Sequence, residues 1–347
     1  MDSVNVKNAR GFGHCCRAYC CLVLGLACLA ASGAAWADDV GEDFLKHCAL
    51  ATPGGNYLAA GASNRITNCK VLEAIRIIRK GRIASLGHKY TDANNTSGKI
   101  TPTEFGRTYS LEAFYFGPFG TNGALFHDDY IQGNLAQVGT QFDSLNHAGT
   151  LNDLDGKDWF HGLQPDQLGI ENVRPIFTRG ILIDVAGLKG RMLKTGEEIT
   201  MADVQVALQR EGLTTEDITS GDAVLFNTGW NQMYKAAESG RPEDVDAWAN
   251  GTPGIGKEVA NWLAKRQIVV AGADNTSVEF APENLEWPDG SFFPLHGYLM
   301  GNQGIFLHEN LDFSALLKNN VYVFVYTFVP VPFAGASGSP GSPIAIW

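Results

Sequence analysis

The stretch TPGIGKEVANWLAKRQIVVAGADN, residues 252–275, contains two kinds of pattern in succession. Up to Gln267 its apolar residues recur at helical spacing, and Pro253 stands near the start, which predicts an amphipathic helix. After Gln267, the segment IVVAGA is a nearly continuous apolar run of strand length. A helix followed directly by a strand that is apolar on both faces is typical of an α/β protein with a buried sheet.

Three further apolar runs have the length and composition of strands. They are RGILIDVA (179–186), DAVLFNTGW (222–230) and NNVYVFVYTFVPVPF (319–333). A helix is predicted between the first two, in TMADVQVALQREG, where Thr200 and Asp203 form a start that resembles a capping box. Strands that alternate with helices predict an α/β fold with a central mixed, partly parallel sheet.

Three other segments complete the predicted organisation. A helix is expected over about 70–80, because CKVLEAIRIIRKG has apolar residues at helical spacing and a glycine after the last turn. Residues 89–108 are polar and predict a surface loop. The last five residues, PIAIW, are too apolar to remain free, so we expect them to dock on the domain.

The first 37 residues have the three-part pattern of a secretory signal peptide. Basic residues precede the apolar run CCLVLGLACLAASGAA, which ends in the small-x-small pattern Ala35-Trp36-Ala37. We expect cleavage after Ala37 and a periplasmic or secreted protein; the alternative is an uncleaved anchor helix, for which the run is short. Residues 38–68 would form an N-terminal arm, and residues 69–347 the folded domain.

The charge of the chain limits its partners. The net charge is −11, and it becomes −13 when the +2 of residues 1–37 is removed. The chain contains no cluster of Lys and Arg residues that would form a basic patch. The composition therefore argues against nucleic acid and against an anionic membrane as a partner, and no apolar stretch after residue 37 is long enough to cross a bilayer.

The cysteines give a second prediction about export. Five of the seven precede Ala37, so Cys48 and Cys69 are the two that remain after cleavage. An oxidising compartment would favour a disulfide between them. Two unpaired thiols are the alternative.

The polar stretch QVGTQFDSLNH, residues 137–147, is a candidate site. Asp143 offers a carboxylate and His147 a titratable imidazole, which are groups that metal-assisted hydrolysis needs. Alone the signal is weak, because a capped surface turn uses the same residue types. The segment FPLHGYLMGNQGIFLHENLDF (293–313) adds His296 and Glu309, which would complete a cluster with Asp143 if the fold brings them together.

These segments resemble the cyclase family, which includes bacterial kynurenine formamidases and isatin hydrolases. The family hallmark is His-x-Gly-Thr-His-x-Asp-x-Pro-x-His, and it aligns with residues 137–147. This chain has Gly-Thr-Gln-x-Asp at the centre of the motif, which resembles one branch of the family. The resemblance covers roughly residues 70–346. It implies a swivelling β/β/α cyclase-like fold, a hydrolase with divalent metal between its strands, a small-molecule substrate and a homo-oligomer.

The resemblance also assigns roles by position. Asp143, His296 and Glu309 fall at metal-ligand positions, and His147 falls at the position of the acid/base. His308, beside Glu309, should point away from the ion if this segment is a strand. The whole interpretation requires that the middle of the chain and its end meet at one point.

The chain departs from the family pattern at three positions. Gln137 and Gln141 stand where the family has histidine ligands, and Leu145 replaces a proline. An amide oxygen is a neutral, hard ligand and weaker than imidazole, so it shifts the preference from Zn²⁺ toward Mn²⁺ or Mg²⁺. We therefore expect one firmly held ion rather than two, Mn²⁺ or Zn²⁺, with help from Gln141 and Gln137.

Two kinds of function follow from these residues. The leading hypothesis is an exported metal-dependent hydrolase that cleaves a C–N amide, either a formamide or a cyclic amide, or a lactone, with His147 as the acid/base. The alternative is a catalytically inactive binding protein on the same scaffold, which the two glutamines favour; a lyase or isomerase is a third, weaker reading. Specificity is expected from pocket walls such as Phe114, Phe116, Trp159 and Phe160.

Overall fold

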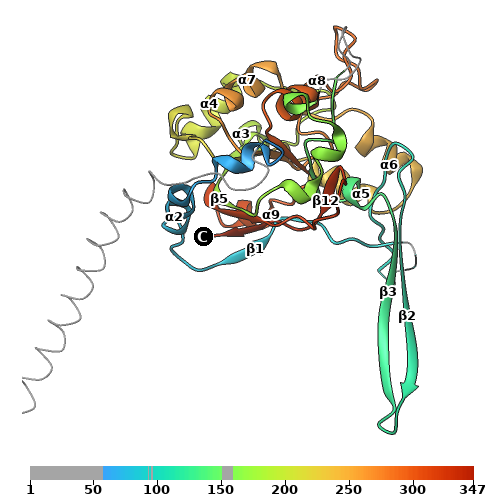
Figure 1. Ribbon diagram of the computed structural model, residues 1–347. Helices are drawn as coiled ribbons and strands as arrows, with labels where there is room; N and C mark the ends of the chain where they lie inside the picture. The colour runs from blue at the N-terminus through green and yellow to red at the C-terminus, as the bar shows by residue number, and fades with distance from the viewer. Residues whose placement is uncertain (1–57, 93, 95–96, 151–158) are drawn as a thin grey trace, which may run out of the picture. The chain divides into compact units, whose positions relative to one another are not determined.

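The computed structural model describes residues 58–92, 94, 97–150 and 159–347, drawn in colour in Figure 1. The predicted signal peptide and most of the predicted N-terminal arm lie outside these residues, so cleavage after Ala37 remains a prediction. Cys69 is disulfide-bonded. Its partner lies outside the described residues, so its pairing with Cys48 also remains a prediction. The described residues all belong to one unit, Ala51–Trp347.

The strands gather mainly into one sheet. Its members are β1 Ile83–Ser85, β4 Gln141–Asp143, β5 Ile176–Asp184, β7 Ala223–Asn227, β9 Val270–Ala273, β10 Phe306–Glu309, β11 Val323–Phe328, β12 Gly338–Pro340 and β13 Ile344–Ile346. Within the described residues the strand order is β1-β13-β11-β5-β7-β9-β10-β4-β12. The central strands β5, β7, β9 and β10 are parallel, and the flanking pairs are antiparallel. The prediction of a mixed, partly parallel sheet is confirmed.

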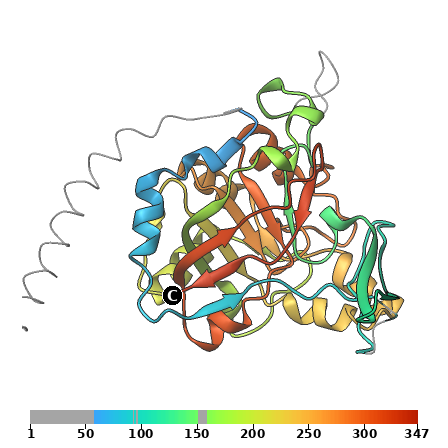
Figure 2. The ribbon, with the colours of Figure 1, turned by 60° about the horizontal axis from the view of Figure 1, so that its bottom comes forward.

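The helices connect these strands and pack around the sheet, as Figure 2 shows. They are α2 Asn68–Ile75, α3 Val185–Lys189, α4 Met201–Arg210, α5 Asn231–Ala237, α6 Pro242–Ala249, α7 Lys257–Lys265, α8 Pro294–His296 and α9 Ser314–Lys318, with a π-helix, η7, over Gly297–Asn302. Strand β7 is buried along its whole length. The central sheet is therefore covered on both faces, as its continuous apolar runs predict. No helix in the described part of the chain combines the length and apolar composition needed to span a membrane.

The C-terminal segment docks as predicted, and it also explains why the first helix is short. Strand β13 lies between β1 and β11 and pairs with both. The backbone N–H groups of Lys80 and Arg82 donate to the carbonyl oxygen of Trp347, at 3.2 and 3.0 Å. Helix α2 therefore ends at Ile75 instead of near residue 80, because the chain must leave the helix to reach this partner.

The predicted helix of residues 252–267 is shorter at its start. Gly254–Ile255 forms a strand, β8, which pairs with β6 Glu198–Ile199. Pro253 therefore precedes a strand, and α7 begins only after Gly256. Helix α4 agrees with its prediction, since the Thr200 and Asp203 side chains form a reciprocal capping box.

A hairpin that the sequence patterns did not indicate lies outside the central sheet. Strands β2 Tyr109–Phe119 and β3 Ala124–Gly133 pair only with each other among the described strands. Figure 1 shows them as a long two-stranded ribbon that leads away from the sheet. The described residues among 89–108 contain no helix or strand, in agreement with the predicted loop, but Glu104 among them is buried.

We predict that His88 makes the fold sensitive to acid. Burial lowers the pKa of His88 to about 4, although the Asp312 and Glu238 carboxylates oppose this. The unfolded chain binds the proton below about pH 6.5, whereas the folded chain binds it only below about pH 4. The free energy of unfolding should therefore fall as the pH decreases between these values.

Denaturant unfolding at several pH values tests this prediction. The His88 ring is stacked on Tyr234 with centroids 3.8 Å apart, so His88→Phe keeps the stacking and removes the titrating group. We expect this variant to lose less stability on acidification than the wild type. Tyr234→Phe, which keeps both the stack and the imidazole, is the matched control. An unchanged pH dependence in His88→Phe would contradict the prediction.

Candidate metal centre

The pairing of β4 with β10 places the first group of site residues on one face of the sheet. The two strands are antiparallel, with Gln141 opposite Glu309 and Asp143 opposite Leu307. Because side chains alternate along a strand and opposed residues share a face, Gln141, Asp143 and Glu309 all project to the same side. Phe142 and His308 project to the other side, where their rings are 5.3 Å apart.

The Gly139-Thr140 dipeptide fixes the start of β4. Gly139 has a positive φ of 64°, and its carbonyl oxygen accepts a hydrogen bond from the side chain of Asn310 at 3.0 Å. The Thr140 hydroxyl donates to the carbonyl oxygen of Asn310 at 2.7 Å and accepts from the backbone N–H of His88. These bonds connect the turn before β4 to the end of β10, so the register that aligns the carboxylates is anchored at both strands.

His296 reaches the same point from helix α8 and is held there by Glu279. Its ring Nδ1 lies 2.7 Å from Glu279 Oε1, and the backbone N–H groups of Leu295 and His296 donate to the same carboxylate. Glu279 is almost fully buried. This carboxylate fixes the orientation of the ring and leaves Nε2 facing Glu309, whose Oε1 is 3.3 Å away.

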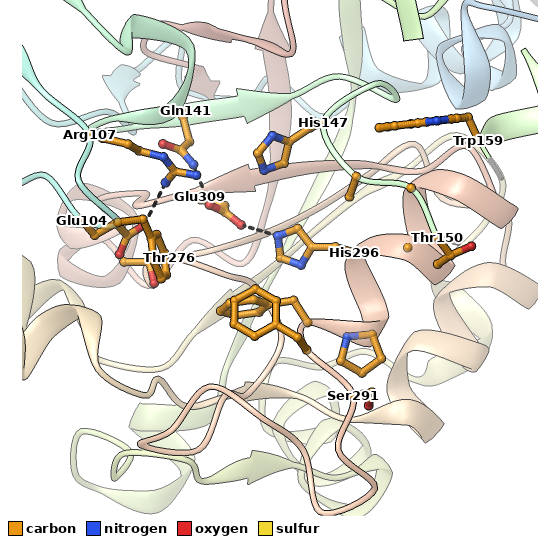
Figure 3. Close-up of a pocket in the computed structure, with 17 residues that line it drawn as sticks. Glu104, Arg107, Gln141, His147, Thr150, Trp159, Thr276, Ser291, His296 and Glu309 are labelled. Carbon is orange, nitrogen blue, oxygen red and sulfur yellow. Dashed lines mark hydrogen bonds and ion pairs between the residues drawn. The ribbon is translucent and has the colours of Figure 1, made fainter. Parts of the chain in front are cut away.

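The predicted site residues converge in the structure. Among the described residues, Asp143, His147 and His296 form a group whose ligand atoms all lie within 4.8 Å of one another, close enough to share an ion. Figure 3 shows His147, His296 and Glu309 directed toward one another. The middle of the chain and its end therefore meet as the sequence interpretation required.

The donor set fits a divalent cation. Asp143 Oδ2 is buried and accepts no hydrogen bond within the described residues, and the buried Glu309 Oε1 has His296 Nε2 beside it at 3.3 Å. A buried carboxylate oxygen without a partner, such as Asp143 Oδ2, is unfavourable unless a positive charge compensates it. Two carboxylates and two imidazoles are also a donor set that Mn²⁺ and Zn²⁺ both accept.

The two glutamines occupy positions next to the carboxylates. The Gln137 side-chain amide donates to Asp143 Oδ1 at 3.0 Å, and the Gln141 amide donates to Glu309 Oε2 at 2.8 Å. Each glutamine therefore occupies one oxygen of a carboxylate and leaves the other oxygen for a ligand role. Gln141 lines the pocket described below. Gln137 is not among the residues that line it, and it contacts the site through its hydrogen bond to Asp143.

The two site histidines differ in their preferred charge. Burial lowers the pKa of His147, with the Asp143 carboxylate opposing this. Burial would also lower the pKa of His296, but hydrogen bonds and charges from Glu279 and Glu309 raise it to about 10. The surroundings thus favour a neutral imidazole at His147 and a positively charged one at His296.

A cavity of about 770 Å³ opens over these residues. Its walls are largely aromatic, formed by Phe105, Trp159, Phe292 and Phe293, and Phe105 and Phe292 remain exposed at the rim. The Trp159 ring lies so close to Gly149 that a Cβ there would come within 2.7 Å of it. Such a cavity suits a flat organic molecule whose polar group reaches the carboxylates and histidines.

Three of the four predicted wall residues do not line this cavity. Phe114 and Phe116 lie on the β2–β3 hairpin, and both are exposed. Phe160 is buried beneath it, with its ring against Gly304. Only Trp159 of the predicted set lines the pocket. Adjacent aromatics in sequence point in different directions, and sequence alone does not show which of them faces the site.

Glu104 and Arg107 are pocket residues that the sequence reasoning missed. Glu104 is buried, and its Oε1 accepts from Arg107 Nη1 at 3.2 Å, while its Oε2 has no partner within the described residues. Burial raises the pKa of Glu104 to about 8, and the negative charges of Glu309 and Asp143 act in the same direction. The one sequence signal was a Glu and an Arg three residues apart, which is common in loops.

His308 lies away from the candidate metal centre, as predicted. Its Nδ1 is 2.5 Å from the Tyr326 hydroxyl, and its ring packs between Phe142 and Phe328. Burial lowers its pKa to about 3, so the ring is neutral. His308 therefore belongs to the core on the opposite face of β10.

Comparison with known proteins identifies the family and the fold of the chain. The sequence model of the "Cyclase" family matches residues 84–280, more than half of the chain. A crystal structure of a novel cyclase is 28% identical, with a TM-score of 0.69 over 83% of this chain and 96% of that one. Isatin hydrolase A from Ralstonia solanacearum is 20% identical, with a TM-score of 0.52 over 76% of this chain and 91% of that one. No curated protein matches the chain.

A second isatin hydrolase has the same fold. Isatin hydrolase A from Labrenzia aggregata, bound to benzyl benzoate, is 18% identical, with a TM-score of 0.50 over 76% of this chain and 93% of that one. The family match and the mixed nine-stranded sheet of the described residues lead to one conclusion. The chain belongs to the cyclase family and has its α/β fold.

We predict that Glu279 supports metal binding through His296. Glu279→Gln removes the charge that orients the ring, so we expect metal affinity to fall by about 10- to 100-fold. Isothermal titration with Mn²⁺ and with Zn²⁺ measures this. Glu211→Gln, a half-buried carboxylate outside the site, is the control and should bind metal like the wild type. Equal affinity in Glu279→Gln and wild type would show that the ring needs no such support.

Proposed function

We propose that this protein is an exported, metal-dependent hydrolase that cleaves a C–N amide or a lactone. The observation that carries the proposal is the convergence of Asp143, His147 and His296 within 4.8 Å, with Glu309 beside them, beneath an aromatic-walled cavity. Buried carboxylates and a half-buried neutral imidazole in a cavity are typical of hydrolytic sites.

The residues divide into those that hold a cation and one that moves a proton. Asp143, His296 and Glu309 would hold a single Mn²⁺ or Zn²⁺, with Gln137 and Gln141 orienting the two carboxylates. A bound divalent ion acidifies water and polarises a carbonyl group. His147, neutral and at the cavity floor, would accept a proton from the attacking water and deliver it to the leaving nitrogen or oxygen.

The pocket favours a flat, weakly polar substrate. Its aromatic walls would stack on a planar ring, while the Glu104–Arg107 pair offers a polar contact at the same level as Glu309. Formamides of aromatic amines, cyclic amides and aromatic lactones share this shape. The fold is also that of two isatin hydrolases, so cyclic amides are placed first among the candidates.

A binding protein without catalysis is the second candidate. It is favoured by Gln137 and Gln141, which stand where the family has histidine ligands and which already hydrogen-bond one oxygen of each carboxylate. Such a protein would keep the pocket and its affinity for a small carbonyl compound while lacking turnover.

Turnover assays distinguish the two candidates. The purified protein, loaded with Mn²⁺ or Zn²⁺, is offered N-formyl anilines, cyclic amides and lactones, and hydrolysis is followed by absorbance. We expect turnover that chelation abolishes and that His147→Ala lowers by about 100-fold or more. His161→Ala, at an exposed histidine near the pocket, should keep wild-type activity. Thermal stabilisation by a compound without any turnover would support the binding protein.

Metal content gives a separate test. We predict one equivalent of Mn²⁺ or Zn²⁺ per chain, because the glutamines replace two imidazoles that a second ion would need. Elemental analysis of the purified protein and equilibrium dialysis measure this number. Two tightly held equivalents of zinc would contradict it, and loss of all metal in Asp143→Asn alone would agree with it.

A further inference from the structure

Arg107 places a positive charge in the wall of the cavity. Among the described residues that line the cavity it is the only Lys or Arg, and its side chain is 20% exposed. Within the described chain its guanidinium group makes one hydrogen bond, from Nη1 to Glu104 Oε1 at 3.2 Å. A guanidinium group carries five N–H donors and stays protonated in proteins. Arg107 therefore offers charged donors to a molecule in the cavity.

The carboxyl group of Glu104 does not fully compensate this charge. Glu104 is buried, and its Oε2 has no hydrogen-bond partner among the described residues. Burial raises the pKa of Glu104 to about 8; the Arg107 charge opposes this, whereas the charges of Glu309 and Asp143 act in the same direction as burial. Near neutral pH the protonated form of Glu104 is favoured, so the positive charge of Arg107 remains available to a ligand.

The turn that presents Arg107 is strained at one residue. Phe105 and Gly106 have positive φ angles of 53° and 70°, and the backbone N–H of Arg107 donates to the carbonyl oxygen of Glu104 at 2.9 Å. Two consecutive residues of this kind form a turn that favours Asn and Gly. Phenylalanine is unfavourable in this conformation and persists only where its surroundings hold it, which is common at binding sites.

Aromatic contacts hold the turn at the mouth of the cavity. The Phe105 ring meets the Phe293 ring edge-on, with centroids 6.4 Å apart, and the Arg107 guanidinium carbon lies 5.3 Å from the centre of the Phe105 ring. A guanidinium group over an aromatic ring is attracted to it while its N–H groups remain available. In Figure 3, Arg107 lies with Glu104 on one side of the cavity and Trp159 on the other. A planar ring between these walls therefore has the guanidinium group at one end.

The chemistry of this wall matches a carboxylate. The planar fork of an arginine fits the two oxygen atoms of a carboxylate, and charge-assisted hydrogen bonds of this kind are about twice as strong as neutral ones. A phosphate group carries about two negative charges near neutral pH, whereas Arg107 has no second Lys or Arg beside it in the described wall. A single carboxylate is therefore the anion that this wall can balance.

We propose that Arg107 forms a subsite for a carboxylate group, so that the ligands of this cavity are planar aromatic compounds that carry an acid group. The ring would lie between the aromatic walls, the carboxylate against Arg107, and the carbonyl group to be cleaved toward His147 and Glu309. The placement of that carbonyl group rests on the proposed function, whereas the carboxylate subsite does not. The subsite narrows the substrate class from amides and lactones in general to those with a carboxylate on the ring system.

Isothermal titration with matched pairs of compounds tests the subsite. The probes are the three formamidobenzoate isomers, each with its methyl ester, which keeps the ring and the formamide and removes the charge. We expect at least one carboxylate to bind the wild type about tenfold or more tightly than its ester, because the ester loses a charge-assisted hydrogen bond. The preferred isomer reports how far the subsite lies from the group that holds the formamide.

Variants of Arg107 assign the preference to its side chain. Arg107→Met keeps the length and removes the charge and the donors, so each carboxylate and its ester should bind within about threefold of each other. Arg107→Lys keeps the charge without the fork and should show an intermediate preference, which guards against misfolding of the first variant. Arg191→Met is the matched control, because Arg191 also pairs with a glutamate, Glu197, but lies outside the cavity. It should keep the wild-type preference.

Binding of the probe carboxylate to a metal ion is the competing explanation. The titrations are therefore run with Mn²⁺ and again after dialysis against a chelator. A preference that survives removal of the metal and disappears in Arg107→Met would support the subsite. A preference that is lost with the metal but retained in Arg107→Met would overturn it, as would equal affinity of every carboxylate and its ester in the wild type.

Turnover separates the subsite from the proposed function. If the wild type hydrolyses a formamidobenzoate, Arg107→Met should raise KM for that compound about tenfold or more and leave kcat/KM for its methyl ester within about threefold of the wild-type value. An unchanged KM would overturn the subsite while the proposed function stands. If no compound is hydrolysed, the proposed function fails and the binding titrations still decide the subsite.

Discussion

The antiparallel pairing of β4 with β10 is the constraint on which the candidate site depends. Two short strands, far apart in sequence, are aligned so that Gln141 faces Glu309 and Asp143 lies on the same side. A shift of β4 by one residue in this register would turn Phe142 toward the site and turn Gln141 and Asp143 away from Glu309. The hydrogen bonds that join Gly139 and Thr140 to Asn310 oppose such a shift. The chemistry of the site therefore follows from the register of one strand pair.

The same pairing explains which parts could be predicted from the sequence. The long apolar strands were predictable because burial on both faces leaves a continuous apolar pattern. Strand β4 has three residues, Gln141–Asp143, too few for any periodicity, and its partner was visible only through the family resemblance. Glu279 and Glu104 lie in irregular segments, where a buried carboxylate looks like any surface one. Phe114 and Phe116 were misplaced because aromatic composition predicts burial but not what covers the ring.

The glutamines in the family motif acquire a physical meaning in this arrangement. The side-chain amide of Gln137 donates a hydrogen bond to Asp143, and that of Gln141 donates one to Glu309. If Asp143 and Glu309 bind a cation as proposed, the two glutamines support its ligands instead of coordinating it. Support of this kind orients Asp143 and Glu309 without adding charge, which matters in a site already crowded with carboxylates.

The position of β13 between β1 and β11 has a consequence for the order in which the sheet assembles. Strand β1 joins the described sheet only through β13, although nearly the whole described chain separates these two strands in sequence. Pairings between segments that lie far apart in the chain form slowly. We therefore expect β1 to be added to the sheet after the parallel strands at its centre.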